Sequence, residues 1–194
     1  EISNILQFHR VDYLAVAYAD EGVELRKAGI TLPIMVMNPE EQSFETMLNY
    51  KLEPEIYSFR MLQQFSDVVK RRLSELPGVK VPVHIKLDTG MHRLGFEMQD
   101  VNELVVRIKN NKHLKVASVF SHLVASDEAV HDGYTNQQAA AFTQMSDLIC
   151  AHFTHKIFRH ILNSAGIMRF PEFQFDMVRL GIGLHGIAAT QHEQ

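Results

Sequence analysis

"PVHIKLDTGMHRLGF", residues 82–96, begins as a buried strand and continues as a loop rich in charge. Residues 83–88 alternate between apolar side chains of one parity and the polar side chains His84, Lys86 and Asp88 of the other. Because successive side chains of a strand point to opposite faces, the apolar set suits a helix-covered face and the polar set points into a barrel. Buried charges need partners. The spacing leaves two interpretations open, a functional site at the strand end or a structural ion-pair network.

Similar strands recur along the chain and alternate with amphipathic helices. The predicted strands are 13–18, 32–38, 55–59, 82–88, 114–123, 159–165 and 176–186. The longest predicted helix is 134–153, with Phe142, Met145, Leu148 and Ile149 facing inward. Connections are short, and no Asn-Gly hairpin signal occurs. About seven βα units of this kind predict a parallel sheet, either an open doubly wound sheet or a closed (β/α)8 barrel.

We predict the barrel, because no G-x-G-x-x-G follows the first strand. About seven units is one short of closure, and barrels usually run to ~250 residues. We therefore expect residues 1–194 to form a single incomplete TIM-type barrel domain that lacks its first strand.

Composition excludes several classes of protein. The chain has 194 residues, of which 46% are hydrophobic and 22% charged, as in ordinary globular proteins. A net charge of −4 favours neither nucleic acid nor an anionic membrane. No apolar run approaches the ~18 residues of a membrane span, and no signal peptide is recognisable. The single cysteine fits a reducing compartment, so we expect a cytoplasmic protein. The histidines show no zinc-ligand spacing, and we predict no metal site.

In a barrel, the active site lies at the C-terminal ends of the strands. His122 ends one predicted strand, either as a functional group or as a satisfied polar residue. Asn163 and Ser164 follow the next strand as N-cap residue types, which suits an anion site or ordinary helix capping. Arg179 has inward parity, and Gly181 lets the backbone approach a ligand closely. Adjacent loops after the last two strands commonly bind phosphate in this fold.

Four stretches in this order resemble bacterial alanine racemase: "KLDTGMHRLGF", "FSHLVASDE", "NSAGIMRFP" and "MVRLGIGLHG". The resemblance covers nearly all of the chain, and T-G-M-x-R-L-G together with M-V-R-x-G-I is a specific pair. It implies a pyridoxal phosphate (PLP) enzyme with a (β/α)8 barrel, a following β-rich domain and a head-to-tail homodimer. It also implies that the enzyme interconverts L- and D-alanine for peptidoglycan synthesis.

The resemblance also assigns roles to individual residues. His122 would pack by the cofactor ring, and Ser164 would hold the phosphate with the backbone of Gly181 and Ile182. Arg179 would face the pyridine nitrogen and, because a guanidinium rarely releases its proton, would keep that nitrogen unprotonated. The residues assigned to the cofactor are His122, Asn163, Ser164, Arg179, Gly181 and Ile182.

On the substrate side, the resemblance implies that Met91 and Arg93 line the carboxylate site, with Lys86 behind Arg93. That lysine is carbamylated in some family members, and as an anion it would orient the guanidinium fork of Arg93 toward a carboxylate. Arg93, Arg179 and His122 are therefore the predicted catalytic residues.

Two features of the family are not found in these residues. The Schiff-base lysine of a K-x-N-A-Y-G-like motif does not occur, and the opposite-face tyrosine belongs to the β-rich domain. We therefore expect the isolated chain to be inactive. His185 also stands where many members have tyrosine. The alternatives are a PLP-carrier barrel protein without racemase activity and a non-catalytic scaffold, and T-G-M-x-R-L-G favours the racemase.

Overall fold

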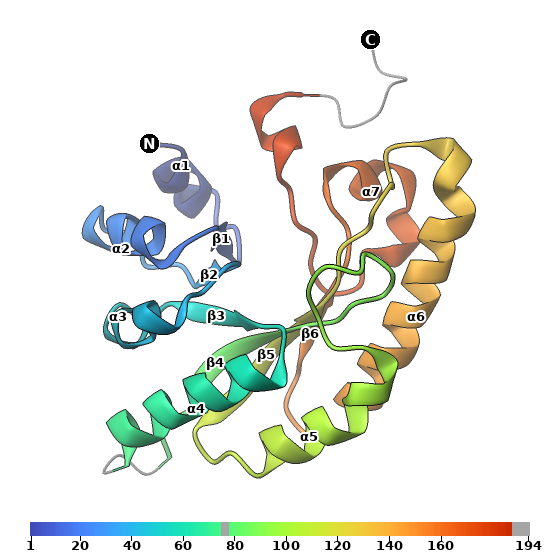
Figure 1. Ribbon diagram of the computed structural model, residues 1–194. Helices are drawn as coiled ribbons and strands as arrows, with labels where there is room; N and C mark the ends of the chain where they lie inside the picture. The colour runs from blue at the N-terminus through green and yellow to red at the C-terminus, as the bar shows by residue number, and fades with distance from the viewer. Residues whose placement is uncertain (75–77, 188–194) are drawn as a thin grey trace. The chain divides into compact units, whose positions relative to one another are not determined.

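The computed structural model describes residues 1–74 and 78–187, over which strands and helices alternate (Figure 1). The strands are β1 Leu14–Val16, β2 Ile34–Val36, β3 Glu53–Ile56, β4 Val81–Lys86, β5 Leu114–Phe120 and β6 Phe158–His160. The α-helices are α1 Ile2–Phe8, α2 Ala19–Lys27, α3 Phe44–Asn49, α4 Phe59–Leu73, α5 Val101–Lys109, α6 Asp132–Cys150 and α7 Ser164–Arg169. Short 3₁₀ turns are η1 Glu41–Ser43, η2 Met98–Asp100, η3 Ala129–His131, η4 Pro171–Phe173 and η5 Ile182–His185. Among these residues, no helix is both long and apolar enough to cross a membrane.

The strand order identifies the fold class. In the described part of the chain the strands are hydrogen-bonded in the order β1-β2-β3-β4-β5-β6, which is their order in the sequence. The pairs β1–β2, β2–β3 and β5–β6 are parallel. In a doubly wound sheet the strand order reverses at a switch point, whereas in a barrel each strand pairs with the next strand in the sequence. The order therefore supports the predicted barrel over the doubly wound alternative.

Residue contacts divide the chain into two compact units, which we describe separately. The first contains residues 1–84 and 108–115. Its α4 begins at Ser58, whose hydroxyl oxygen accepts a hydrogen bond from the Met61 backbone N–H at 3.2 Å. Phe65 is fully buried and meets Phe44 edge to face, with the ring centroids 5.1 Å apart. This helix buries an apolar face made of Met61, Leu62, Phe65 and Val69.

The second unit contains residues 85–107 and the chain from Val116 onward. Its longest helix, α6, buries Phe142, Met145 and Ile149, as predicted. The prediction for Leu148 is wrong, because this side chain is 45% exposed. At about 100° per residue, position 148 lies about 120° around the helix from position 142, at the edge of the buried face and not on it. Hydrophobic character alone did not reveal this.

The prediction of a strand over residues 176–186 is also wrong. Two backbone hydrogen bonds join this segment to β6 and the residues just after it, from the N–H of Asp176 to the carbonyl of Arg159 (3.1 Å) and from the N–H of Arg179 to the carbonyl of Leu162 (3.0 Å). Between them the Asp176 carboxylate accepts the Arg159 N–H at 3.0 Å, so a side chain replaces a ladder bond. The chain then turns into η5. The segment follows β6 without forming a regular strand.

Candidate functional site

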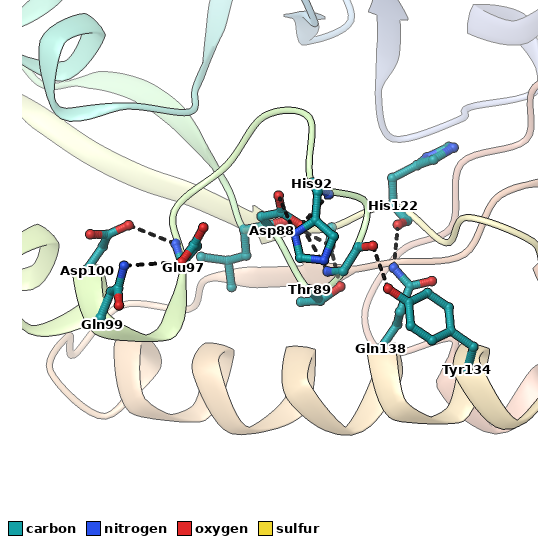
Figure 2. A network of polar contacts seen from close by, with 12 residues as sticks. Asp88, Thr89, His92, Glu97, Gln99, Asp100, His122, Tyr134 and Gln138 are labelled. Carbon is teal, nitrogen blue, oxygen red and sulfur yellow. Dashed lines mark hydrogen bonds and ion pairs between the residues drawn. The ribbon is translucent and has the colours of Figure 1, made fainter.

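The loop between β4 and α5, residues 88–96, is fixed by its own backbone. Phe96 N–H donates to the Lys86 carbonyl and Asp88 N–H donates to the Phe96 carbonyl, both at 2.9 Å. One carboxylate oxygen of Asp88 accepts the N–H groups of Gly90 (2.9 Å) and His92 (3.0 Å), as Figure 2 shows. We call this segment the carboxylate loop, because it carries Met91 and Arg93. His92 and Arg93 are exposed in this loop, whereas Met91 is half-buried.

The polar side chains of β4 differ in role. His84, in the first unit, is fully buried, and its Nε2 lies 2.9 Å from the Glu53 carboxylate. The Tyr13 hydroxyl donates to the same carboxylate oxygen at 3.3 Å, and burial, reinforced by Glu53, raises the pKa of that phenol. His84 therefore belongs to a structural ion-pair network, which is one of the two interpretations that the sequence left open. Lys86, in the second unit, is 6% exposed, with its Nζ 5.6 Å from the centroid of the Phe120 ring.

Arg179 occupies the centre of the polar cluster in the second unit. Its Nη2 donates to the Ser121 carbonyl at 2.6 Å and to the Ile161 carbonyl at 3.2 Å. Its Nη1 lies 2.6 Å from Nδ1 of His160. A guanidinium can only donate, so that Nδ1 is an acceptor. The proton of this fully buried imidazole therefore sits on Nε2, which donates to the Ser118 hydroxyl at 2.9 Å. Arg179 is thus held in place by neutral groups.

His122 stands in the loop after β5, beside three cations. Its Nδ1 lies 3.5 Å from Arg179 Nη2. Burial, followed by the positive charges of Arg179, Lys86 and Arg93, lowers the pKa of His122 from 6.5 to about 4. His122 is therefore neutral at pH 7. Its electrostatic coupling to these three cations shows that four of the predicted site residues lie in one neighbourhood.

A second cluster lies where α7 begins. The Asn163 side-chain oxygen accepts the Gly166 N–H (2.9 Å) and the Ser126 hydroxyl (2.8 Å), so ordinary helix capping holds for Asn163. The Ser164 hydroxyl oxygen accepts the N–H groups of Gly181 (3.0 Å) and Gly183 (3.2 Å). Ser164 is 7% exposed, yet its hydroxyl proton remains available to an anion.

The donors around Ser164 fit a phosphate group. A hydroxyl and the backbone amides of the following turn lie together, which is a donor set that suits a phosphate oxygen. Gly181 has no positive φ, and a Cβ placed there would lie 3.8 Å from the Ser164 oxygen, an ordinary contact. The glycine is thus not required by the chain's own packing. Ile182 is 53% exposed at the start of η5.

Sequence reasoning missed several residues that build this site. His160 was predicted to lie in a strand but was not predicted to belong to the site. It is a polar residue on a buried strand, which is the same signal that pointed to His84, Lys86 and Asp88. Ser121 accepts Arg179 on its carbonyl, and its hydroxyl donates to the Leu87 carbonyl at 2.8 Å. Tyr134 and Gln138 also contact the site loops, and their spacing of one helical turn was the available signal. No cluster of three or more potential metal ligands occurs among the described residues.

Comparison with known proteins gives a consistent result. The family model described as "Alanine racemase, N-terminal domain" matches residues 1–189. The chain is 34% identical over 185 residues to the alanine racemase of Synechocystis sp., covering 93% of this chain and 48% of that protein. It thus spans about half the length of the curated relatives it matches.

Solved structures extend the comparison to the fold. The alanine racemase of Clostridium difficile 630 superposes with a TM-score of 0.87 at 34% identity, covering 96% of this chain and 51% of that one. The alanine racemase of Bacillus anthracis, solved with bound L-Ala-P, gives 0.79 at 25% identity, covering 96% of this chain and 47% of that one. The predicted fold class, an incomplete TIM-type barrel, is confirmed.

Proposed function

Because the chain belongs to the alanine racemase family, we propose that the whole protein is a PLP-dependent isomerase that interconverts L- and D-alanine. This proposal rests on the proximity of two groups in the sequence. The Arg179 guanidinium is held by hydrogen bonds to other segments, and Gly181, two residues later, donates its backbone N–H to the Ser164 hydroxyl oxygen. Together these groups suit a ligand with an aromatic nitrogen at one end and a phosphate at the other.

We expect PLP to be held by the phosphate donors Ser164, Gly181 and Ile182, with His122 beside the ring and Asn163 shaping the turn. PLP supplies an electron sink that acidifies the Cα–H of an amino acid. The Arg179 guanidinium has no acceptor atom, so it cannot take a proton from a ring nitrogen. It also does not readily release one of its own protons to that nitrogen. His122 is neutral at pH 7, so it adds no charge beside that ring. Of these two residues, Arg179 therefore supplies the positive charge beside the ring and His122 supplies none.

On the substrate side, Arg93 offers a planar fork of donors to a carboxylate, and Met91 supplies apolar surface beside it. Lys86 lies buried behind this loop. A carbamylated Lys86 would become an anion, which would attract and orient the guanidinium of nearby Arg93. The relative solved with L-Ala-P carries an alanine-like ligand, which supports alanine as the substrate. A homodimer and a role in peptidoglycan synthesis follow from the same family resemblance.

The test uses the full-length protein, since these residues span about half of a typical relative. With PLP present, circular dichroism should follow L-alanine to a racemic mixture, and the reverse reaction from D-alanine should end at the same signal. Arg93→Met should raise the KM for alanine by ten-fold or more, because a charge-assisted hydrogen bond contributes about 1.5–3 kcal/mol. A wild-type protein that binds PLP without racemising alanine would refute the proposal and favour a PLP-carrier protein.

A further inference from the structure

The first turns of α6 carry two polar side chains that face the loops of the site. Tyr134 and Gln138 are spaced i, i+4, so they lie above one another on one face of the helix. Figure 2 shows both projecting from α6, Tyr134 toward the carboxylate loop and Gln138 toward the backbone of His122. Neither side chain belongs to the cofactor or substrate groups described above.

Tyr134 is anchored to the carboxylate loop. Its hydroxyl donates to the carbonyl of Gly90 at 2.6 Å, across 44 residues of sequence. The residue is 39% exposed, and its hydroxyl makes its most specific contact. On the other side of the same residue, the Asp88 carboxylate accepts the Gly90 N–H at 2.9 Å. The residue immediately before Met91 is thus held from both sides.

Gln138 is anchored to the loop after β5. Its amide nitrogen donates to the His122 carbonyl at 3.1 Å, and its amide oxygen accepts the Val124 N–H at 3.0 Å. The side chain is 1% exposed, and both ends of the amide are used. A buried amide with two backbone partners in one loop fixes the path of that loop, because losing either partner leaves a buried polar group unpaired.

The two anchors meet at Gly90. A Cβ at this position would overlap the Tyr134 hydroxyl and would lie 3.5 Å from Cγ of Gln138. The φ of Gly90 is +131°, which non-glycine residues rarely adopt. The glycine of T-G-M therefore lets one face of α6 pack directly against the carboxylate loop. A single helix turn thereby sets the position of Met91 and Arg93 relative to His122.

We propose that Tyr134 and Gln138 are positioning residues, which place the substrate-carboxylate loop and the His122 loop at a fixed separation. This inference rests on the proposed function for its meaning in catalysis, since the two loops carry the proposed substrate and cofactor groups. It assigns the two residues different roles. Tyr134 positions the loop that carries Arg93 and so affects binding of the substrate carboxylate, whereas Gln138 positions the loop that carries His122 and so affects binding of the cofactor.

Three variants of the full-length protein test this division. Tyr134→Phe removes one hydroxyl and keeps the ring, and Gln138→Leu removes both hydrogen bonds of the amide. Gln137→Ala is the control, because Gln137 is the exposed neighbour on the same helix turn. For each variant we would measure kcat and KM for L-alanine, the inhibition constant of acetate, the Kd of PLP, and hydrogen–deuterium exchange of peptides covering residues 88–96 and 121–126. Acetate reports on the carboxylate end alone.

Tyr134→Phe should raise KM and the acetate inhibition constant about five-fold, which is the loss of one hydrogen bond of ordinary net strength. It should change kcat and the PLP Kd less than two-fold and speed exchange in residues 88–96. Gln138→Leu should raise the PLP Kd about ten-fold or more and speed exchange in residues 121–126, because a buried carbonyl and a buried N–H both lose their partner. Gln137→Ala should match the wild type in every measurement.

Two results would overturn the proposal. One is Tyr134→Phe with unchanged KM, acetate inhibition and exchange. The other is a uniform loss of kcat, PLP affinity and thermal stability in both variants, which indicates helix packing only. The exchange data keep the two claims separate. A wild-type protein without racemase activity would refute the proposed function, while selective exchange changes in the two loops would still support the anchoring itself.

Discussion

Replacing Gly90 by alanine should destabilise the protein for two separable reasons. The backbone at φ +131° is strained for any residue with a Cβ, at about 1–3 kcal/mol. The added methyl would also overlap the Tyr134 hydroxyl, so the tyrosine must move away and lose its 2.6 Å hydrogen bond to the Gly90 carbonyl. That second contribution is about 1 kcal/mol. We expect Gly90→Ala to lower the free energy of unfolding by about 2–4 kcal/mol in total.

A double-mutant cycle separates the two contributions. Tyr134→Ala removes the overlapping group but leaves the backbone strain in place. The double variant Gly90→Ala/Tyr134→Ala should therefore be more stable than the sum of the single effects predicts, by about 1 kcal/mol or more. Urea unfolding of the four proteins, with midpoint and slope compared, gives this coupling energy.

The matched control is Gly29, whose φ of +86° carries the same kind of strain but whose Cβ would meet nothing within 4 Å. Gly29→Ala combined with Tyr134→Ala should be additive. Additivity within about 0.5 kcal/mol in the Gly90 cycle as well would refute the reasoning, because distant sites normally add within that range. It would mean that Tyr134 does not occupy the space that the glycine leaves.

Four further outcomes follow from the structure. The pKa of His122 is 6.5 in the unfolded chain and about 4 in the folded chain. Its contribution to stability is therefore present above pH 6.5 and is lost as pH falls toward 4, by up to about 3 kcal/mol. His122→Asn should make the free energy of unfolding less dependent on pH over this window. Arg179→Met should raise the pKa of His122 in an NMR titration without restoring 6.5, because burial is the larger cause. Ser164→Ala should weaken binding of PLP and inorganic phosphate about equally, because the hydroxyl acts on the phosphate. Thr135→Val should leave the protein equally or more stable in thermal unfolding, because the buried Thr135 hydroxyl has no hydrogen-bond partner among the described residues.

Local chemistry determined much of this protein in advance. Strand parity over residues 83–88 predicted that Lys86 is buried, and capping preference placed the start of α7 at Asn163. α2 ends just before Gly29, whose positive φ is a conformation that glycine adopts readily. Each of these features depends on residues a few positions apart, so a short stretch of sequence is enough to predict it.

Tertiary structure alone decided how the site is held together. The bond from Tyr134 to Gly90 spans 44 residues, and the bond from Arg179 to Ser121 spans 58. Which of several exposed or buried polar residues makes such a contact depends on how α6 and the loops pack, and no local pattern contains that information. The same reason explains the irregular segment 176–186, where the Asp176 side chain takes a backbone partner that a strand would have used. The sequence by itself determined which residue types stand at the strand ends, and packing decided which of them meet.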